Sequence, residues 1–208
     1  MGEVEVPDGG SHDELRLRRM HFYVRHGFVL EPVRSRVYGV TYRVISYARP
    51  ASMTADEKIW QLFYVTPELL TGVETATRAG DSTKNALEEQ PVGGIIYFAK
   101  NLESRAQTQE MLHNTKAYTK IPLFLGTDEE GGTVSRVGSN PAMGAQEFPS
   151  AQSLGEQADP AAVYQAGQDI GGTLHAIGFN MDFAPVADVS SGASAVIGSR
   201  SFGTDPQL

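Results

Sequence analysis

Acidic and arginine side chains gather in short stretches of the second half of the chain. The candidates for ligand contact are Asp128, Arg136 and Arg200, with Glu130, Asp182 and Asp188 as supporting acids. A carboxylate accepts hydrogen bonds from neighbouring hydroxyl groups, and an arginine donates several to ring or acyl oxygens. Two glycines follow Glu130 directly, and glycine lets the backbone turn sharply or approach a ligand. The combination favours a polyhydroxylated ligand such as a sugar.

Metal chemistry and thiol chemistry fit the sequence less well. The chain has no cysteine, which excludes thiol catalysis, disulfides and cysteine-ligated zinc. No histidine lies beside these acids and arginines, within residues 127–136, 183–189 or 197–202. An all-carboxylate magnesium site is the alternative that the residues leave open. A purely structural role, with the acids capping helices and pairing with the arginines, is also open.

Four apolar runs would place these polar stretches at the ends of strands. The runs cover residues 61–65, 94–98, 122–127 and 180–186. Three of them are nearly continuously apolar, which is typical of parallel strands buried on both faces. Loops that follow parallel strands meet at one end of the sheet and carry the functional residues. We therefore expect Asp128, directly after the third run, to lie at that end.

Helix signals separate the apolar runs. Capping-box sequences predict helices that begin near residues 55 and 105. Asp159 before Pro160 predicts a third helix, whose apolar stripe ends at Gly178. The alternation predicts an α/β fold with a parallel sheet, as the first four units or so of a (β/α)₈ barrel. A flavodoxin-like open sheet is the alternative, although no glycine-rich phosphate loop follows the first strand.

Residues 1–50 differ in composition from the rest. They contain eight arginines and no lysine and carry a net charge of +2, whereas the remainder carries −10. This change predicts a domain boundary near residue 50, with domains at 1–50 and 51–208. Within the first domain we expect a helix over 13–26 and a hairpin of strands over 29–37 and 40–47.

Residues 15–50 contain Phe22-Tyr23, then His26-Gly27-Phe28, and then the two predicted strands. With this pattern the segment resembles the C-terminal piece of GNAT-superfamily N-acetyltransferases. The resemblance implies that Tyr23 matches a general acid that reprotonates a departing CoA thiolate. The loop that binds pyrophosphate in that family has no counterpart in residues 1–15, so acetyl transfer is the weaker functional expectation.

Residues 52–208 contain five ordered motifs: Val-Gly-Gly-Ile-Ile-Tyr-Phe at 92–98, Asp-Glu-Glu-Gly-Gly at 128–132 with Arg136, Phe-Pro-Ser at 148–150, the run 178–189, and Ile-Gly-Ser-Arg-Ser-Phe at 197–202. Through these motifs the segment resembles the N-terminal domain of glycoside hydrolase family 3, in its bacterial β-N-acetylhexosaminidase branch. The resemblance implies retaining hydrolysis of terminal β-linked N-acetylglucosamine through a glycosyl-enzyme intermediate, without a metal or organic cofactor.

The same resemblance assigns roles to the candidate residues. Asp128 matches an acid that binds hydroxyl groups of the terminal sugar, and Arg136 and Arg200 match arginines that hold it. Glu130, Asp182 and Asp188 match supporting acids. The family's nucleophilic aspartate, its Gly-His-Gly loop and its Lys-His pair have no match in residues 1–208. We therefore expect a truncated chain whose catalytic residues lie beyond residue 208 and which is inactive alone. A β-glucosidase and a non-catalytic carbohydrate-binding fragment are the alternatives.

Charge and hydropathy restrict the partners. A net charge of −8 disfavours nucleic acid, because the surface would repel phosphate. No apolar run approaches the roughly 20 residues of a membrane helix. No signal peptide is visible at the N-terminus, which slightly favours the cytoplasm. Half a barrel has two open sheet edges, so self-association is also expected.

Overall fold

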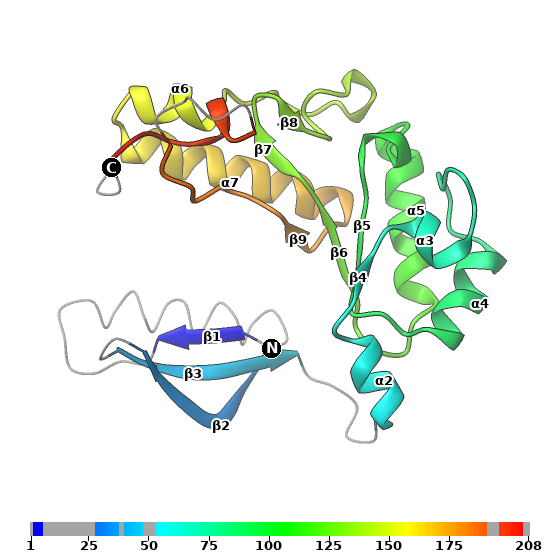
Figure 1. Cartoon of the computed structure of the whole chain (residues 1–208). Coiled ribbons are helices and arrows are strands. Elements are labelled where there is room, and N and C mark those ends of the chain that lie inside the picture. Colours follow the sequence, from blue (N-terminus) through cyan, green and yellow to red (C-terminus); the bar gives the residue numbers. More distant parts are fainter. Residues whose placement is uncertain (1, 6–27, 38–39, 48–52, 191–195, 206–208) are drawn as a thin grey trace. The chain divides into compact units, whose positions relative to one another are not determined.

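The computed structural model of the chain describes residues 2–5, 28–37, 40–47, 53–190 and 196–205 (Figure 1). The chain divides into two compact units, residues 1–54 and 55–208, and each is described by itself. The family-like motifs all lie in the second unit.

The first unit contains a three-stranded antiparallel sheet with the order β1-β3-β2. Its strands are β1 (Gly2–Glu5), β2 (Phe28–Val37) and β3 (Val40–Tyr47). Pairing of β2 with β3 confirms the hairpin predicted from the Val- and Tyr-rich runs, whereas β1 was not predicted. The expected helix over 13–26, with Tyr23, lies outside the described residues.

The second unit contains a four-stranded sheet in which all neighbouring strands are parallel. Its strands, in spatial and chain order, are β4 (Tyr64–Val65), β5 (Gly94–Ile96), β6 (Phe124–Thr127) and β9 (Met181–Asp182). The parallel sheet and the alternating helices confirm the predicted α/β class. Consecutive strands that are also spatial neighbours are the arrangement that a (β/α)₈ barrel requires.

Helices connect the strands, and several begin where their capping residues predict. They are α2 (Ala55–Trp60), α3 (Pro67–Thr71), α4 (Asp81–Glu89), α5 (Arg105–Ala117), α6 (Ala151–Glu156) and α7 (Pro160–Ile177), with short 3₁₀ turns η1 (Ala99–Asn101), η2 (Pro141–Met143) and η3 (Gly198–Arg200). The Ser104 hydroxyl accepts a hydrogen bond from the Gln107 amide at 3.3 Å, which completes the predicted N-cap of α5. At α7, Asp159 accepts from the Ala161 amide at 2.9 Å, and Gly178 ends the helix in the left-handed conformation.

The fourth strand is shorter than predicted, because β9 covers two residues of the expected run 180–186. The Asn180 side chain takes the place of a strand backbone: its Oδ1 accepts from the Leu125 amide at 2.7 Å, and its Nδ2 donates to the Leu123 carbonyl at 3.0 Å. Beyond the strand, Pro185 has no N–H to donate to a ladder. The predicted length was therefore wrong, although the position was right.

Aromatic rings fill the inner face of the sheet above two glycines. Tyr64 on edge strand β4 and Phe183, directly after edge strand β9, lie 5.9 Å apart between ring centroids. Tyr64 also stacks on Phe124 at 6.0 Å. A Cβ atom on Gly126 would lie 2.7 Å from the Phe183 ring, and one on Gly94 would overlap Tyr64. Rings from opposite edges meet only when a sheet is strongly curved, as it is in a barrel wall.

The other face of the sheet is covered by helices and forms the apolar core (Figure 1). Ile95 and Leu125 of the central strands are fully buried, as is Leu112 of α5. A hydrogen bond of 3.1 Å from Gln109 Nε2 to the Ala176 carbonyl joins α5 to α7. No helix among the described residues has the length and apolar character needed to cross a membrane.

Candidate functional site

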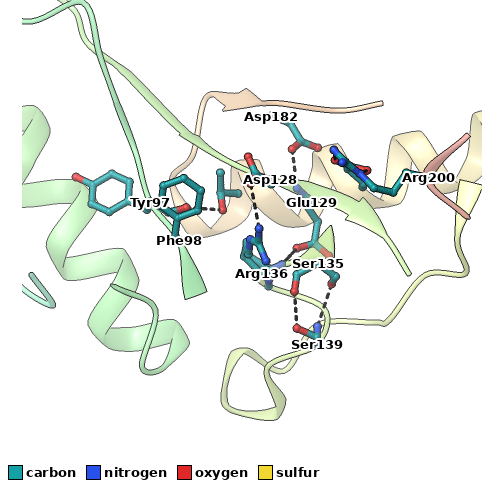
Figure 2. A network of polar contacts seen from close by, with 12 residues as sticks. Tyr97, Phe98, Asp128, Glu129, Ser135, Arg136, Ser139, Asp182 and Arg200 are labelled. Carbon is teal, nitrogen blue, oxygen red and sulfur yellow. Dashed lines mark hydrogen bonds and ion pairs between the residues drawn. The ribbon is translucent and has the colours of Figure 1, made fainter. Parts of the chain in front are cut away.

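The candidate site lies at the carboxyl end of β6, where the sequence predicts it. Asp128 follows β6 directly, and the chain then forms a small antiparallel hairpin of β7 (Glu129–Gly131) and β8 (Val134–Ser135). Gly131 and Gly132 have positive φ angles of 83° and 60°, so the turn uses the backbone freedom of glycine. The hairpin returns the chain toward Asp128 (Figure 2).

Asp128 and Arg136 form an ion pair at the open side of this hairpin. Arg136 donates from one terminal nitrogen to Asp128 Oδ2 at 3.2 Å. The guanidinium also lies over the Phe98 ring, 5.8 Å from its centroid. The Arg136 Nε is buried and has no hydrogen-bond partner. The Arg136 side chain as a whole is 28% exposed, so the accessible part of its guanidinium can still donate to a ligand oxygen.

Glu130 and Arg200 form a second, bidentate pair. Arg200 donates from Nε to one carboxylate oxygen at 2.9 Å and from a terminal nitrogen to the other at 2.7 Å. The Glu130 side chain is 6% exposed and the Arg200 side chain is 30% exposed, so the acid is shielded from water while the arginine is partly accessible. Hydrogen bonding to Glu130 raises the pKa of Arg200 against the opposing effect of burial. The structure thus places Arg200 beside the site, with its guanidinium bound to the Glu130 carboxylate of β7.

The segment that carries Arg200 is held against α6. Gly155 of α6 lies so close to the Phe202 carbonyl that a Cβ atom at position 155 would overlap it. The Ser201 hydroxyl donates to the Asp188 carbonyl at 2.6 Å. The Asp188 carboxylate is on the exposed surface and contributes to the charge around Arg200. Asp188 therefore supports this segment through its backbone.

Asp182 is the acid of the cluster whose protonation is most perturbed. Its Oδ1 accepts from the Glu129 amide at 2.9 Å, and no ion pair to it occurs among the described residues. Burial, together with the nearby carboxylates of Glu129, Asp128 and Glu130, raises the pKa of Asp182 to about 7, against the lowering effect of the hydrogen bond from the Glu129 amide. Near neutral pH this carboxyl is therefore partly protonated.

Glu129 is a residue of the cluster that sequence reasoning missed. Its side chain is 3% exposed, and it accepts hydrogen bonds from the backbone and side chain of residues 135–138. Strand alternation was an available signal, because Asp128 and Glu130 share one face of the chain while Glu129 points to the other.

Within the described part of the chain, no group of three or more His, Asp or Glu side chains is arranged to hold a metal ion.

Comparison with known proteins connects this geometry to a family. Residues 54–208 match the glycosyl hydrolase family 3 N terminal domain. A β-hexosaminidase from Bordetella avium is 37% identical over 134 residues, which cover 62% of this chain and 37% of that protein. The chain therefore spans little more than a third of the length of the curated relatives it matches.

Solved structures give the same connection. A family 3 β-N-acetylglucosaminidase from a Paenibacillus species superposes with a TM-score of 0.67 at 32% identity, over 75% of this chain and 28% of that one. A fungal multi-domain family 3 β-N-acetylglucosaminidase, described as having a GCN5-related glucosamine N-acetyltransferase region, has a TM-score of 0.64 at 28% identity, over 74% and 18%. The family match begins at residue 54, so the acetyltransferase resemblance of residues 15–50 is not supported. Through residues 54–208, the chain belongs to glycoside hydrolase family 3.

Proposed function

We propose that residues 54–208 form the sugar-holding part of a retaining β-N-acetylhexosaminidase. The observation that carries the proposal is the Asp128–Arg136 pair at the carboxyl end of β6, whose side chains are 19% and 28% exposed and so can be reached by a ligand. A hydroxylated ring supplies both hydroxyl donors for Asp128 and an oxygen acceptor for Arg136. The relatives include a β-hexosaminidase and a β-N-acetylglucosaminidase, which favours N-acetylglucosamine as that ring.

Catalysis requires two further groups. Retaining glycosidases place a nucleophilic carboxylate and a proton donor on opposite sides of the glycosidic oxygen. We propose that Asp128 is engaged in holding the sugar with Arg136 and that both reacting groups come from outside residues 54–208. The 208-residue chain should then bind the sugar without cleaving it.

Titration of the chain with N-acetylglucosamine tests the proposal. We expect the parent chain to bind the sugar saturably, with a dissociation constant in the millimolar range. The dissociation constant should rise about tenfold or more in Asp128→Asn and in Arg136→Ala, because each variant loses a charge-assisted hydrogen bond. The exposed Glu89 gives a matched control, and Glu89→Ala should bind as the parent does.

Two outcomes would contradict the proposal in different ways. An absence of heat and of amide chemical-shift changes at millimolar sugar would refute the sugar-holding role. Turnover of a chromogenic β-N-acetylglucosaminide by the purified chain would instead refute its inactivity. A parallel titration with glucose separates this reading from the β-glucosidase alternative, which predicts equal or tighter binding of glucose.

Self-association of the 208-residue chain is a further expectation. In the four-stranded sheet, β4 and β9 are the edge strands, and the exposed apolar side chains include Tyr64 at 39% and Phe183 at 37%. Open edges of parallel strands offer backbone groups for pairing with another chain. Light scattering after size exclusion should give a mass above that of one chain at micromolar concentration. A monomer that persists as the concentration rises would contradict this expectation.

A further inference from the structure

The carboxylate of Glu129 is buried and satisfied by the loop that follows it. Its Oε2 accepts from the Arg136 amide at 2.8 Å and from the Val137 amide at 2.6 Å. Its Oε1 accepts from the Gly138 amide at 3.1 Å and from the Ser135 hydroxyl. Four donors from four consecutive residues thus converge on one side chain. Consecutive amides that point into one concavity stabilise a negative charge without a cation.

This set of bonds determines the path of the chain between the two members of the ion pair. The amide that Arg136 donates to Glu129 belongs to the same residue whose guanidinium reaches Asp128. A Cβ atom at Gly138 would lie 2.9 Å from Glu129 Oε1, so a side chain there would disturb the carboxylate. The Ser139 amide donates to the Ser135 hydroxyl at 3.0 Å, which continues the network (Figure 2).

The backbone of Glu129 is fixed as well. Its amide donates to Asp182 Oδ1 at 2.9 Å, which joins the start of β7 to β9 of the four-stranded sheet. Glu129 is therefore held on the sheet by its amide while its side chain gathers residues 135–138. The Asp128–Arg136 ion pair has 19% and 28% of its side chains exposed, and a partly exposed pair alone would hold the loop weakly.

We propose that Glu129 is a positioning residue of the sugar site: its buried carboxylate folds residues 135–138 back so that Arg136 meets Asp128. The inference rests on the proposed function, because it assigns Glu129 to the pair that is proposed to hold the sugar. Glu129 itself is too buried to touch a ligand. Its effect on binding is exerted through the placement of Arg136.

Hydrogen exchange tests the inference without requiring sugar. In Glu129→Ala, the amides of Arg136, Val137 and Gly138 should exchange about tenfold faster or more, while core amides such as Leu112 and Leu125 keep their protection. The control Glu89→Ala should leave all of these rates unchanged. Unchanged protection of residues 136–138 in Glu129→Ala would overturn the inference.

The conservative variant Glu129→Gln covers the case in which Glu129→Ala unfolds the whole unit. Its single amide oxygen can accept from two donors, while its NH₂ group faces the remaining ones. We expect selective acceleration of exchange for some of residues 136–138 and an affinity for N-acetylglucosamine weaker than that of the parent. Exchange rates equal to those of the parent would again overturn the inference.

Titration with N-acetylglucosamine separates failure of this inference from failure of the proposed function. A parent chain that does not bind the sugar, with exchange changes confined to residues 136–138 in the variants, would refute the proposed function alone. A folded Glu129→Ala that binds the sugar with the parent's affinity would show that Arg136 is positioned without Glu129, and would overturn the inference alone.

Discussion

The Gly155→Ala variant is expected to lose about 2 kcal/mol of unfolding free energy, although alanine is the better helix former. Within α6, replacing glycine by alanine gains up to about 1 kcal/mol from helix propensity. Against that gain, the added Cβ would overlap the Phe202 carbonyl, and a backbone atom cannot rotate away as a side chain does. Overpacking of this kind costs about 1–3 kcal/mol or more, so the steric effect wins.

The same variant should also weaken sugar binding. Displacement of Phe202 would move the segment that carries Arg200 and loosen its bidentate contact with Glu130. Denaturant unfolding followed by circular dichroism measures the first effect, and titration with N-acetylglucosamine measures the second.

Gly167→Ala is the matched control for this comparison. Gly167 also lies inside a helix, α7, but a Cβ atom there would meet nothing within 4 Å. The helix-propensity gain should therefore appear alone, and the variant should be more stable than the parent by up to about 1 kcal/mol. A Gly155→Ala variant that gains stability as Gly167→Ala does would show that the contact of α6 with Phe202 is not close in solution.

The second large effect is expected from Asp182→Asn and depends on pH. The pKa of Asp182 is about 7 in the folded chain, against about 3.9 in an unfolded one, so the folded state binds the proton more tightly. Stability from this group is therefore fully present below about pH 4 and is lost as the pH rises through about 7. Asparagine is neutral throughout and keeps an oxygen that can accept the Glu129 amide.

We expect Asp182→Asn to match the parent at pH 4 and to exceed its stability at pH 8 by about 2 kcal/mol. That figure is about half of what the full shift would give, because water screens a side chain that is only partly buried. Unfolding free energies measured at intervals from pH 4 to pH 8 test this. Asp169→Asn, which removes an exposed carboxylate of α7, is the matched control measured over the same pH range. A pH-independent difference for Asp182→Asn would show that the Asp182 carboxyl has the same pKa in the folded and the unfolded chain.

Local signals predicted α2, α5 and α7 but not α3, α4 and α6, and they predicted the strands only in outline. The N-caps of α5 and α7 were readable because Ser104 and Asp159 act on amides a few residues away. Thr66 before Pro67 carries a similar signal for α3, which was missed because the helix has five residues. Helix α4 was missed because its buried face consists of Thr83 and Leu87, too few for a visible period.

The sequence was sufficient to predict which residues belong to the candidate site, but not which acid pairs with which arginine. The sequence indicated Asp128, Arg136 and Arg200 as independent ligand contacts. The structure pairs the first two and attaches the third to Glu130, across 70 residues of chain. Such pairing depends on how α6 and β7 approach one another, which no local pattern encodes. Glu129 was missed because it stands between Asp128 and Glu130, and the three acids carry the same charge in the sequence. Only its burial in the folded chain sets Glu129 apart.

The rings that lie over glycines on the inner face of the sheet link distant positions in the evolution of this domain. Phe183 occupies the space that any side chain at position 126 would need, and Tyr64 does the same for position 94. The two members of each pair must therefore change together, with a larger residue on the central strand requiring a smaller one on the edge strand. Among homologous sequences, we expect positions 126 and 183, and positions 94 and 64, to covary in side-chain volume so that each pair keeps a nearly constant sum.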